Sequence, residues 1–279
     1  MTTKFTADQI IQIIEKHKSN DDPHGDSAFK IDYENPFPSQ KGGTFYNFLI
    51  ENSSGTFEPL KIKFQDCISL FDSKSALFPG FSISFSVDSV YIQKNGIEQK
   101  IGLAVDLCSQ AYVRIMNRLL KENKISNDNP RIIEPVRRHR KDKNTGQKIA
   151  NKRPFWVVKV PFKRDEKDIA DNTVASIDIF DAKLKIPPDD PRYKPRGLNF
   201  ELARYEGEPI VYKNIGKYIA RGSKISGFMN MSSIFCGTTG NILICTALTL
   251  IVNSYNINHP SPDDIFTTDE FNTNEEFED

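Results

Sequence analysis

The chain has 279 residues, of which 38% are hydrophobic and 27% are charged, a composition that suits folded domains and excludes a chain that is disordered throughout. Its 37 basic and 37 acidic residues give a formal net charge of zero. The last seventeen residues, 263–279, hold eight of the acidic residues and no basic one, so residues 1–262 carry 37 basic against 29 acidic side chains. A basic body joined to an acidic tail indicates a polyanionic partner such as nucleic acid.

Other features narrow the class of protein further. The four cysteines have no C-x-x-C spacing and the four histidines are scattered, which predicts reduced, structural cysteines in an intracellular protein, with no metal site and no cofactor. The first residues lack the apolar core of a signal peptide. The most apolar run, 242–252, is about half as long as the ~20 residues that a membrane span requires, so we expect no membrane contact.

The first predicted element is a helix that begins after Thr6. Thr6 and Gln9 have the spacing of a capping box, and an apolar stripe continues to about Lys18. Residues 19–43 are rich in Asp, Pro, Gly and Ser and predict a loop. Alternating apolar and polar residues then predict strands with one buried face at 44–51, 58–65 and 81–87.

The second half of the chain continues the strand-rich pattern. A hairpin turn at Asn95-Gly96 leads into a predicted helix at 104–123, and the polar, basic segment 126–153 predicts a flexible connection. Further strands are predicted at 154–162, 175–185, 208–213, 224–235 and 241–253. With roughly seven to nine strands and no alternating βαβ order, the chain predicts a mainly β fold, an antiparallel barrel or sandwich with added helices.

The segment 131–156 gives the strongest functional signal, because it carries nine cationic residues against two acidic ones. The nine are Arg131, Arg137, Arg138, Arg140, Lys141, Lys143, Lys148, Lys152 and Arg153. Basic residues on a mobile loop can follow a phosphate backbone and release its counterions, which gives salt-dependent binding with little sequence preference. A solvated loop or a nuclear import signal is the alternative interpretation.

Aromatic residues next to cationic ones are the other candidates for contact with nucleic acid. In the strand predicted at 154–162, alternation places Trp156 on the apolar face, so we expect it in the core, and places Phe155 with the lysines, where its ring is the candidate to stack on a base. The remaining predicted contacts lie on this strand, on the strand at 58–65 and in the stretch DDPRYKPRG: Lys159, Lys163, Lys61, Lys63, Tyr193, Lys194 and Arg196.

Catalytic motifs are sparse. The chain lacks a G-x-x-x-x-G-K-[ST] loop and a spaced Ser/His/Asp or Cys/His set, so we predict no enzymatic activity and no catalytic residue. One alternative is a metal-dependent nuclease or other DNA-processing enzyme, in which Asp178 and Asp181 would hold Mg²⁺ and Lys183 would assist the attacking water. A second alternative is a non-catalytic interaction or virion-structural protein.

The C-terminal segment 256–279 is too acidic and too poor in aliphatic residues to fold alone, which predicts a disordered tail. Three phenylalanines, Phe266, Phe271 and Phe277, interrupt its carboxylates. Carboxylates can replace phosphates and phenylalanines can replace bases, so the tail is predicted to compete with nucleic acid for the basic body and to recruit partner proteins when it is displaced. A plain solubilising extension is the alternative.

Several stretches together resemble a known family. The opening MTTKFTADQIIQIIEKHKS, the strands TFYNFLIENSSGTFEPLKIKFQD, the passage from FSISFSV to the helix SQAYVRIMNRLLKE, and the late pair KISGFMNMSSIF and NILICTALTLIVN follow the order and spacing of these proteins. In this the chain resembles the single-stranded DNA-binding proteins of nucleocytoplasmic large DNA viruses, of the poxvirus and African swine fever virus type. The resemblance covers most of residues 1–255.

The resemblance implies an oligonucleotide-binding (OB) barrel over residues 1–255 and sequence-tolerant binding of single-stranded DNA. It also implies a role in viral DNA replication, recombination or repair, in the host cytoplasm or nucleus. Other single-strand-binding families have acidic, aromatic-containing tails, which implies a polymerase, helicase or primase as the partner of residues 256–279. Self-association is left open.

Overall fold

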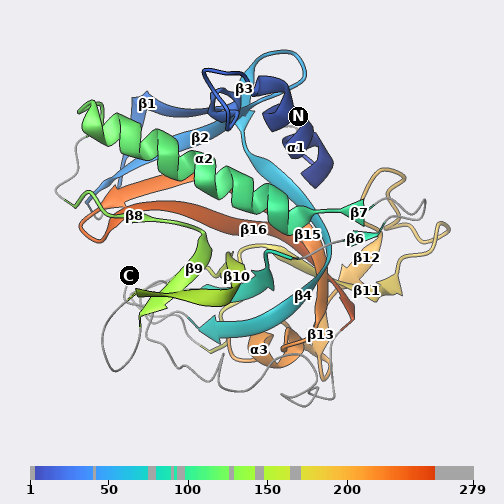
Figure 1. Ribbon diagram of the computed structural model, residues 1–279. Coiled ribbons are helices and arrows are strands. Elements are labelled where there is room, and N and C mark those ends of the chain that lie inside the picture. The colour runs from blue at the N-terminus through green and yellow to red at the C-terminus, as the bar shows by residue number, and fades with distance from the viewer. Residues whose placement is uncertain are drawn as a thin grey trace.

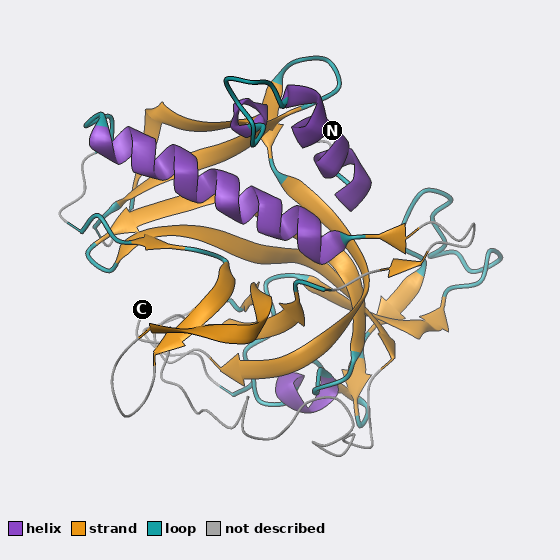
Figure 2. Cartoon of the chain, in the orientation of Figure 1, coloured by secondary structure: helices purple, strands orange, loops and turns teal. Residues whose placement is uncertain are grey.

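The computed structural model describes residues 4–39, 42–74, 80–88, 91–92, 98–125, 129–141, 148–163 and 171–254. Outside these ranges lie the Asn95-Gly96 turn, Lys143 and the tail with Phe266, Phe271 and Phe277. Within them the fold is mainly β, as predicted, with one large sheet and a few helices (Figure 2). None of the helices in the described part of the chain is long and apolar enough to span a membrane.

The helical segments are α1 (Ala7–His17), the 3-10 turn η1 (Asp26–Ala28), α2 (Ile101–Lys121) and α3 (Ile215–Tyr218). The long strands are β1 (Phe29–Pro38), β2 (Thr44–Glu51), β4 (Lys61–Lys74), β5 (Gly80–Ser86), β9 (Val136–Lys141), β10 (Lys148–Pro161), β11 (Asp178–Lys185), β15 (Lys224–Gly237) and β16 (Gly240–Ser254). The short strands are β3 (Phe57–Pro59), β6 (Tyr91–Ile92), β7 (Glu98–Gln99), β8 (Ile132–Ile133), β12 (Phe200–Leu202), β13 (Arg204–Tyr205) and β14 (Glu208–Pro209).

Five strands of the large sheet close into a ring. The ring runs β4, β5, β10, β16, β15 and back to β4, and each of these neighbours is antiparallel except the parallel pair β10–β16. Such a five-stranded Greek-key barrel is the architecture of OB folds. It provides a curved outer surface on which residues of different strands lie side by side.

The barrel interior is filled by the apolar residues of the alternating strands. Trp156 is fully buried, as predicted, with its ring 4.7 Å from that of Phe85 and 5.9 Å from that of Phe64. Its indole Nε1 donates a hydrogen bond to the carbonyl oxygen of Ser86 at 3.2 Å. Because these side chains face inward, the alternate residues of the same strands, including Lys61 and Lys63, face outward.

Strands β15 and β16 extend beyond the barrel and carry β2, β1 and β8 at their far end. Helix α2 crosses one face of this extension, and the opposite face has no described helix over it (Figure 1). The Tyr112 hydroxyl of α2 donates to the carbonyl oxygen of Asn241 at 2.7 Å, and its ring lies edge-on to Phe48 of β2. The inward residues of β2 and β16 therefore pack under α2, and the outward residues face away from it.

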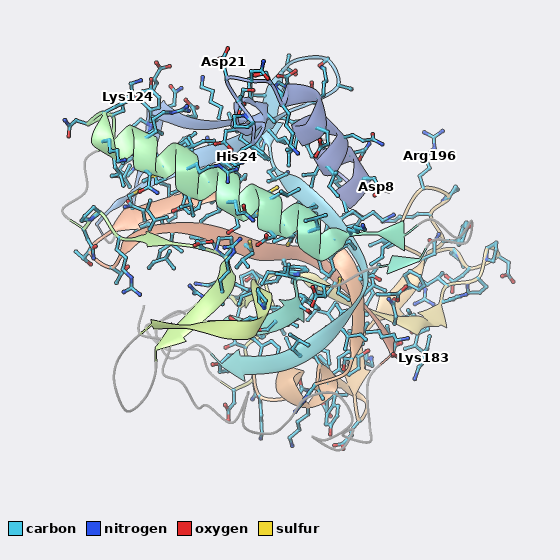
Figure 3. The ribbon with its side chains drawn as sticks, viewed as in Figure 1. Asp8, Asp21, His24, Lys124, Lys183 and Arg196 are labelled. Atoms are coloured by element: carbon cyan, nitrogen blue, oxygen red, sulfur yellow. The ribbon has the colours of Figure 1, made fainter. Side chains whose placement is uncertain are left out.

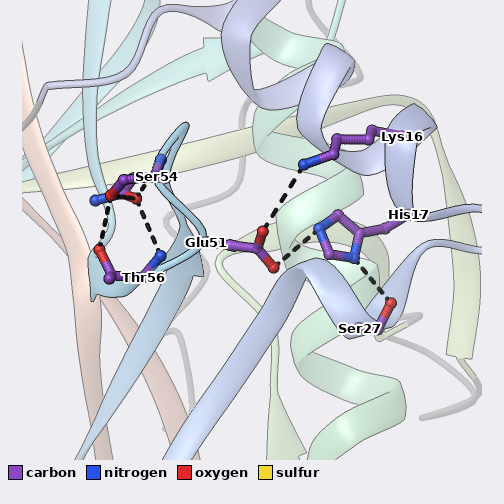
Figure 4. A network of polar contacts seen from close by, with 7 residues as sticks. Lys16, His17, Ser27, Glu51, Ser54 and Thr56 are labelled. Atoms are coloured by element: carbon purple, nitrogen blue, oxygen red, sulfur yellow. Dashed lines mark hydrogen bonds and ion pairs between the residues drawn. The ribbon is translucent and has the colours of Figure 1, made fainter.

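Helix α1 begins as the capping-box prediction states. Thr6 Oγ1 accepts from the backbone N–H of Gln9, and Gln9 Oε1 accepts from that of Thr6. The helix ends at His17, whose Nδ1 is hydrogen-bonded to Ser27 Oγ and whose Nε2 lies 3.1 Å from the Glu51 carboxylate (Figure 4). These contacts fix the helix to β2 and to the segment before β1.

Three predicted segments differ from the structure. The predicted loop 19–43 contains β1, an edge strand whose exposed half includes two prolines, so its pattern resembled a loop. The predicted flexible connection 126–153 contains β8, β9 and the start of β10, because pairing between β9 and β10 orders a segment whose residues are individually polar. The strand predicted at 208–213 is only the two-residue β14, followed by α3.

The four cysteines are all free and buried, and their side chains pack in the hydrophobic core. Burial raises the pKa of the Cys236 and Cys245 thiols to about 12, and it also raises the pKa of Cys67 and Cys108. A thiol is nucleophilic only as the thiolate, so none of these groups is suited to nucleophilic chemistry at neutral pH.

Candidate nucleic-acid interface

A row of polar and cationic residues crosses four strands on the outer surface of the barrel. In the ladders, Lys61 of β4 pairs with Asn230 of β15, Asn230 pairs with Thr246 of β16, and Thr246 pairs with Lys159 of β10. Residues paired in this way share one face, and neighbouring strands lie ~4.8 Å apart. The two lysines are therefore about 14 Å apart along the curved surface, with hydrogen-bonding side chains between them.

A second row adds an aromatic ring to the same face. Lys63 pairs with Phe228 of β15, and the Lys4 ammonium lies 3.8 Å from the centre of the Phe228 ring. Lys4 is held there because the backbone of Phe5 exchanges hydrogen bonds of 2.8 Å with Lys61 and Lys63. We call Lys4, Lys61, Lys63 and Lys159, with Phe228, Asn230 and Thr246 between them, the lysine face.

Sequence reasoning found three of the four lysines but missed Lys4 and Phe228. Phe228 and Asn230 alternate with the buried Met229 and Met231, so the alternation in KISGFMNMSSIF places both on the outer face. That they lie beside Lys61 and Lys63 follows only from the pairing of strands that are far apart in sequence.

The basic segment forms a hairpin of β9 and β10. The ladder pairs Lys141 with Lys148, Arg140 with Ile149 and Arg137 with Phe155. Five of the predicted contacts lie on the described backbone of this hairpin without a description of their side chains: Arg140, Lys141, Lys148, Lys152 and Arg153. Arg131 precedes the hairpin and is exposed, Arg137 is half-buried, and Lys163 is exposed just beyond the end of β10.

Arg138 has a different environment from the one predicted. Its guanidinium forms ion pairs with Asp106 of α2 and with Glu134, and Ser109 of α2 donates a hydrogen bond to Glu134. Two carboxylates thus surround one cation, and the cluster fixes β9 to α2. Arg138 is a structural residue here and does not present an uncompensated charge to a phosphate.

Phe155 is 8% exposed, so its ring offers little surface to a base. Alternation separated it correctly from Trp156, but β9 pairs with β10 at this point and Arg137 lies opposite Phe155. Alternation predicts the face of Phe155 but not its burial, which depends on neighbours that are distant in sequence. We do not place Phe155 in the interface.

The loop between β11 and β12 presents Tyr193, Lys194 and Arg196 around an open surface hollow. The Asn199 side chain holds the loop by hydrogen bonds of 2.8 and 2.9 Å to the backbone N–H and C=O of Lys194. Figure 3 shows Arg196 projecting outward at the edge of the molecule. Its flanking strands join the same sheet through β16, but the pairing of β11 with β16 lies toward Val252, beyond Thr246, so the loop is a separate cationic site.

The arrangement of the acidic residues does not favour the nuclease alternative. Asp178 is exposed on the outer face of β11, whereas Asp181 is 7% exposed on the inner face and accepts a hydrogen bond from the backbone N–H of Lys183 at 2.9 Å. Residues three apart on a strand point to opposite faces, so the two carboxylates do not converge. Across the described ranges, no three His, Cys, Asp or Glu residues are placed to hold a metal ion.

Replacing Arg138 by alanine is expected to lower the free energy of unfolding by about 2 kcal/mol, because Asp106 and Glu134 would keep partly buried charges without their cation. Urea unfolding checks this, with Arg131→Ala as the control for an exposed arginine of the same segment. A loss of DNA affinity in Arg138→Ala with unchanged stability would show instead that Arg138 contacts DNA.

No family model matches the chain, and no curated protein matches it. Among solved structures it is similar to the crystal structure of gp2.5, a single-stranded DNA binding protein encoded by bacteriophage T7. The identity is 12% and the TM-score 0.30, over 73% of this chain and 92% of that chain. Since similarity at this level transfers neither residues nor function, the resemblance to proteins of large DNA viruses stays a prediction.

Proposed function

We propose that the protein binds single-stranded DNA with little sequence preference and has no enzymatic activity of its own. The observation that carries the proposal is the lysine face, where four lysines and one phenylalanine lie together on the outside of a five-stranded barrel. Lysines are point charges that bind phosphates of any sequence, and an aromatic ring stacks on any base. The excess of basic residues in 1–262 supports a polyanionic ligand.

The β9–β10 hairpin and the loop with Tyr193, Lys194 and Arg196 extend the proposed interface beyond the lysine face. Both carry cations on backbone that the structure describes, and Arg131 lies next to the hairpin. A single strand is flexible enough to contact separate cationic sites, and OB domains contact ~4–16 nucleotides. We propose that this binding serves the replication, recombination or repair of viral DNA, as the resemblance implies.

We also propose that the acidic tail competes with DNA and recruits replication proteins. Strand β16 ends at Ser254, which pairs with Lys224, and the same strand contributes Thr246 to the lysine face. The 24 residues of 256–279 span at most about 80 Å when extended, so they can reach this face from that end. Their carboxylates complement its lysines, and Phe266, Phe271 and Phe277 complement its aromatic ring.

Deletion of residues 256–279 is expected to tighten binding to oligo-dT about tenfold at ~50 mM salt and to have no effect near ~1 M, because salt screens the tail as it screens DNA. Fluorescence anisotropy over a salt series measures this. A tail in which the acidic residues are replaced by Asn and Gln, with the phenylalanines kept, separates charge from length. Unchanged affinity of the deletion variant at low salt would contradict competition.

The proposed function is tested by titrating the full chain against single- and double-stranded oligonucleotides, with and without Mg²⁺. We expect salt-sensitive binding that prefers the single strand, and an intact probe at the end. Equal binding of both forms would favour an interaction or virion-structural protein. Cleavage of the probe that requires Mg²⁺ and disappears in Asp181→Ala would establish the nuclease alternative.

A further inference from the structure

A row of three phenylalanines crosses the sheet extension on the same face of β15 as the lysine face. Phe37 of β1 pairs with Phe45 of β2, and Phe45 pairs with Phe235 of β15. The rings of Phe45 and Phe235 lie 5.0 Å apart with an interplanar angle of 49°. We call Phe37, Phe45 and Phe235 the phenylalanine row.

The three rings differ in how much of their surface meets solvent. Phe37 on the edge strand is 54% exposed, whereas Phe45 and Phe235 are half-buried. The row ends at Ile242 of β16 and the buried Ile133 of β8, which lie beside Phe235 in the ladders. An apolar strip thus runs from the buried Ile133 to an open aromatic edge at Phe37, on the edge strand β1.

The backbone around Phe235 is shaped to hold its ring. A Cβ atom on Gly43, which has a φ of +80°, would lie 2.8 Å from two ring carbons, and one on Gly237 would lie 2.5 Å from another. With glycine at both positions the ring lies directly against the backbone, and at Gly43 the positive φ also favours glycine. Phe235 is therefore a fixed support, against which Phe45 packs and next to which Phe37 stands open.

Charge and position identify the kind of molecule that fits this row. A register shift in β15 between Asn230 and Ser233 puts Phe235 on the same face as Asn230, because their partners Ile242 and Thr246 are four residues apart on β16. The row is therefore about 15 Å from the lysine face on one continuous surface. At its other end stands the exposed Arg131, whose backbone carbonyl accepts a hydrogen bond from Asn241 at 2.8 Å. The turn between β15 and β16 adjoins the row, and the loop between the fourth and fifth barrel strands is one that OB domains use to contact oligonucleotides.

We propose that the phenylalanine row is a base-stacking platform for the single strand that the lysine face binds, with Phe37 and Phe45 in contact with bases and Phe235 as their support. This inference rests on the proposed function and adds an aromatic contact region on the sheet extension outside the barrel. Bases are favoured over a protein partner because the exposed ring is aromatic and the row lies on the same surface as the lysine face, with Arg131 at its far end. Stacking of this kind does not depend on base identity.

The test uses a tryptophan as a local reporter. The native Trp156 is fully buried, so the fluorescence of Phe37→Trp above the wild-type level comes from the exposed edge of the row. We expect oligo-dT to quench this added emission strongly. The control is Leu103→Trp, because Leu103 is 39% exposed on α2, on the opposite side of the sheet, and its emission should be unaffected.

An affinity measurement separates stacking from charge. Phe37→Ala combined with Phe45→Ala should weaken oligo-dT binding at least tenfold while leaving the dependence of log Kd on log salt unchanged, because no cation is removed. Phe37→Tyr keeps the ring and should bind like the wild type. If the double variant is poorly folded, the tryptophan reporter and Phe37→Tyr still decide the question.

The outcomes distinguish this proposal from the proposed function. If the full chain binds oligo-dT but the Phe37→Trp emission is not quenched, the platform is refuted and single-strand binding stands. If the chain binds no single-stranded DNA, the proposed function fails and the platform fails with it. If Phe37→Ala with Phe45→Ala leaves binding unchanged but lowers the sedimenting mass of the free protein, the row is a self-association surface and the proposal is wrong.

Discussion

Replacement of Lys61 and Lys63 by glutamine is expected to weaken single-stranded DNA binding about 25-fold at ~0.1 M salt and scarcely at all at ~1 M. Each phosphate contact on a single strand contributes about 0.7 to the slope of log Kd against log salt, which is about fivefold per lysine at ~0.1 M. Both lysines lie on the outer face of β4 beside Asn230 and Phe228. Their removal should therefore lower the slope by about 1.4.

The matched control removes two charges from the other side of the sheet. Arg118 and Lys121 are exposed on the last turn of α2, and Arg118→Gln with Lys121→Gln changes the net charge by the same amount. Anisotropy titrations over a salt series should show only a small loss of DNA affinity for this double variant, of similar size at every salt concentration. Equal losses of slope in both double variants would show that overall charge, and not the lysine face, determines the affinity.

Much of the fold was predictable because burial on one side of a sheet leaves a local trace. Alternation predicts strands at 44–51 and 81–87, and the structure confirms them as β2 and β5, with Phe48 and Phe85 fully buried. The single strand predicted at 58–65 spans the end of β3 and the start of β4, which are separated at Leu60, and β4 continues to Lys74. The capping box at Thr6 is also a local signal, so the start of α1 was predicted correctly. These features depend only on residues within a few positions of each other.

The missed elements depend on partners that are distant in sequence. Strand β1 has few buried residues and is ordered by pairing with β2, and β9 is ordered by β10 and by the ion pairs of Arg138 to Asp106 and Glu134. A basic, polar segment gives no local sign of such partners. The sequence therefore predicted a flexible loop where the structure has a hairpin.

In the candidate site, too, features set by nearby residues could be predicted, whereas contacts between distant strands could not. Alternation correctly placed Lys61 and Lys63 on an outer face, but it could not show that Phe228 lies beside them across about 165 residues of chain. The phenylalanine row could not be predicted for the same reason. Phe37, Phe45 and Phe235 share a face only because β1, β2 and β15 are neighbours in the sheet. The sequence gives the faces of single strands, whereas the site is built by the order of strands in the sheet.

A shift from about pH 8 to about pH 10 is expected to lower the free energy of unfolding by about 8 kcal/mol through the four buried thiols. Burial holds the pKa of Cys236 and Cys245 at about 12 and raises that of Cys67 and Cys108, whereas an unfolded cysteine titrates near ~8.5. Between these values the unfolded chain loses thiol protons that the folded chain keeps. Each thiol then lowers stability by up to about 1.4 kcal/mol per pH unit.

Whether the free energy of unfolding rises or falls with pH depends on which state, folded or unfolded, binds more protons. Below about pH 8 both states hold the thiol protons and stability does not depend on these groups, while above about pH 9 the folded state binds more, so stability falls as pH rises. Urea unfolding in the presence of a reductant at intervals from pH 7.5 to 10, values chosen around the unfolded pKa of ~8.5, measures the slope. Since folded domains are stable by only ~5–15 kcal/mol, the chain should approach its unfolding midpoint near the upper end.

A single substitution tests whether the thiols cause the fall in the free energy of unfolding with pH. Cys245 is 3% exposed beside α2, and Cys245→Ala removes one of the four titrating groups whatever the small cavity does to the absolute stability. The slope between about pH 9 and 10 should therefore fall by about a quarter. A slope that is the same in Cys245→Ala and in the wild type would show that other groups govern the alkaline unfolding, and the burial of this thiol would then have no measurable role in it.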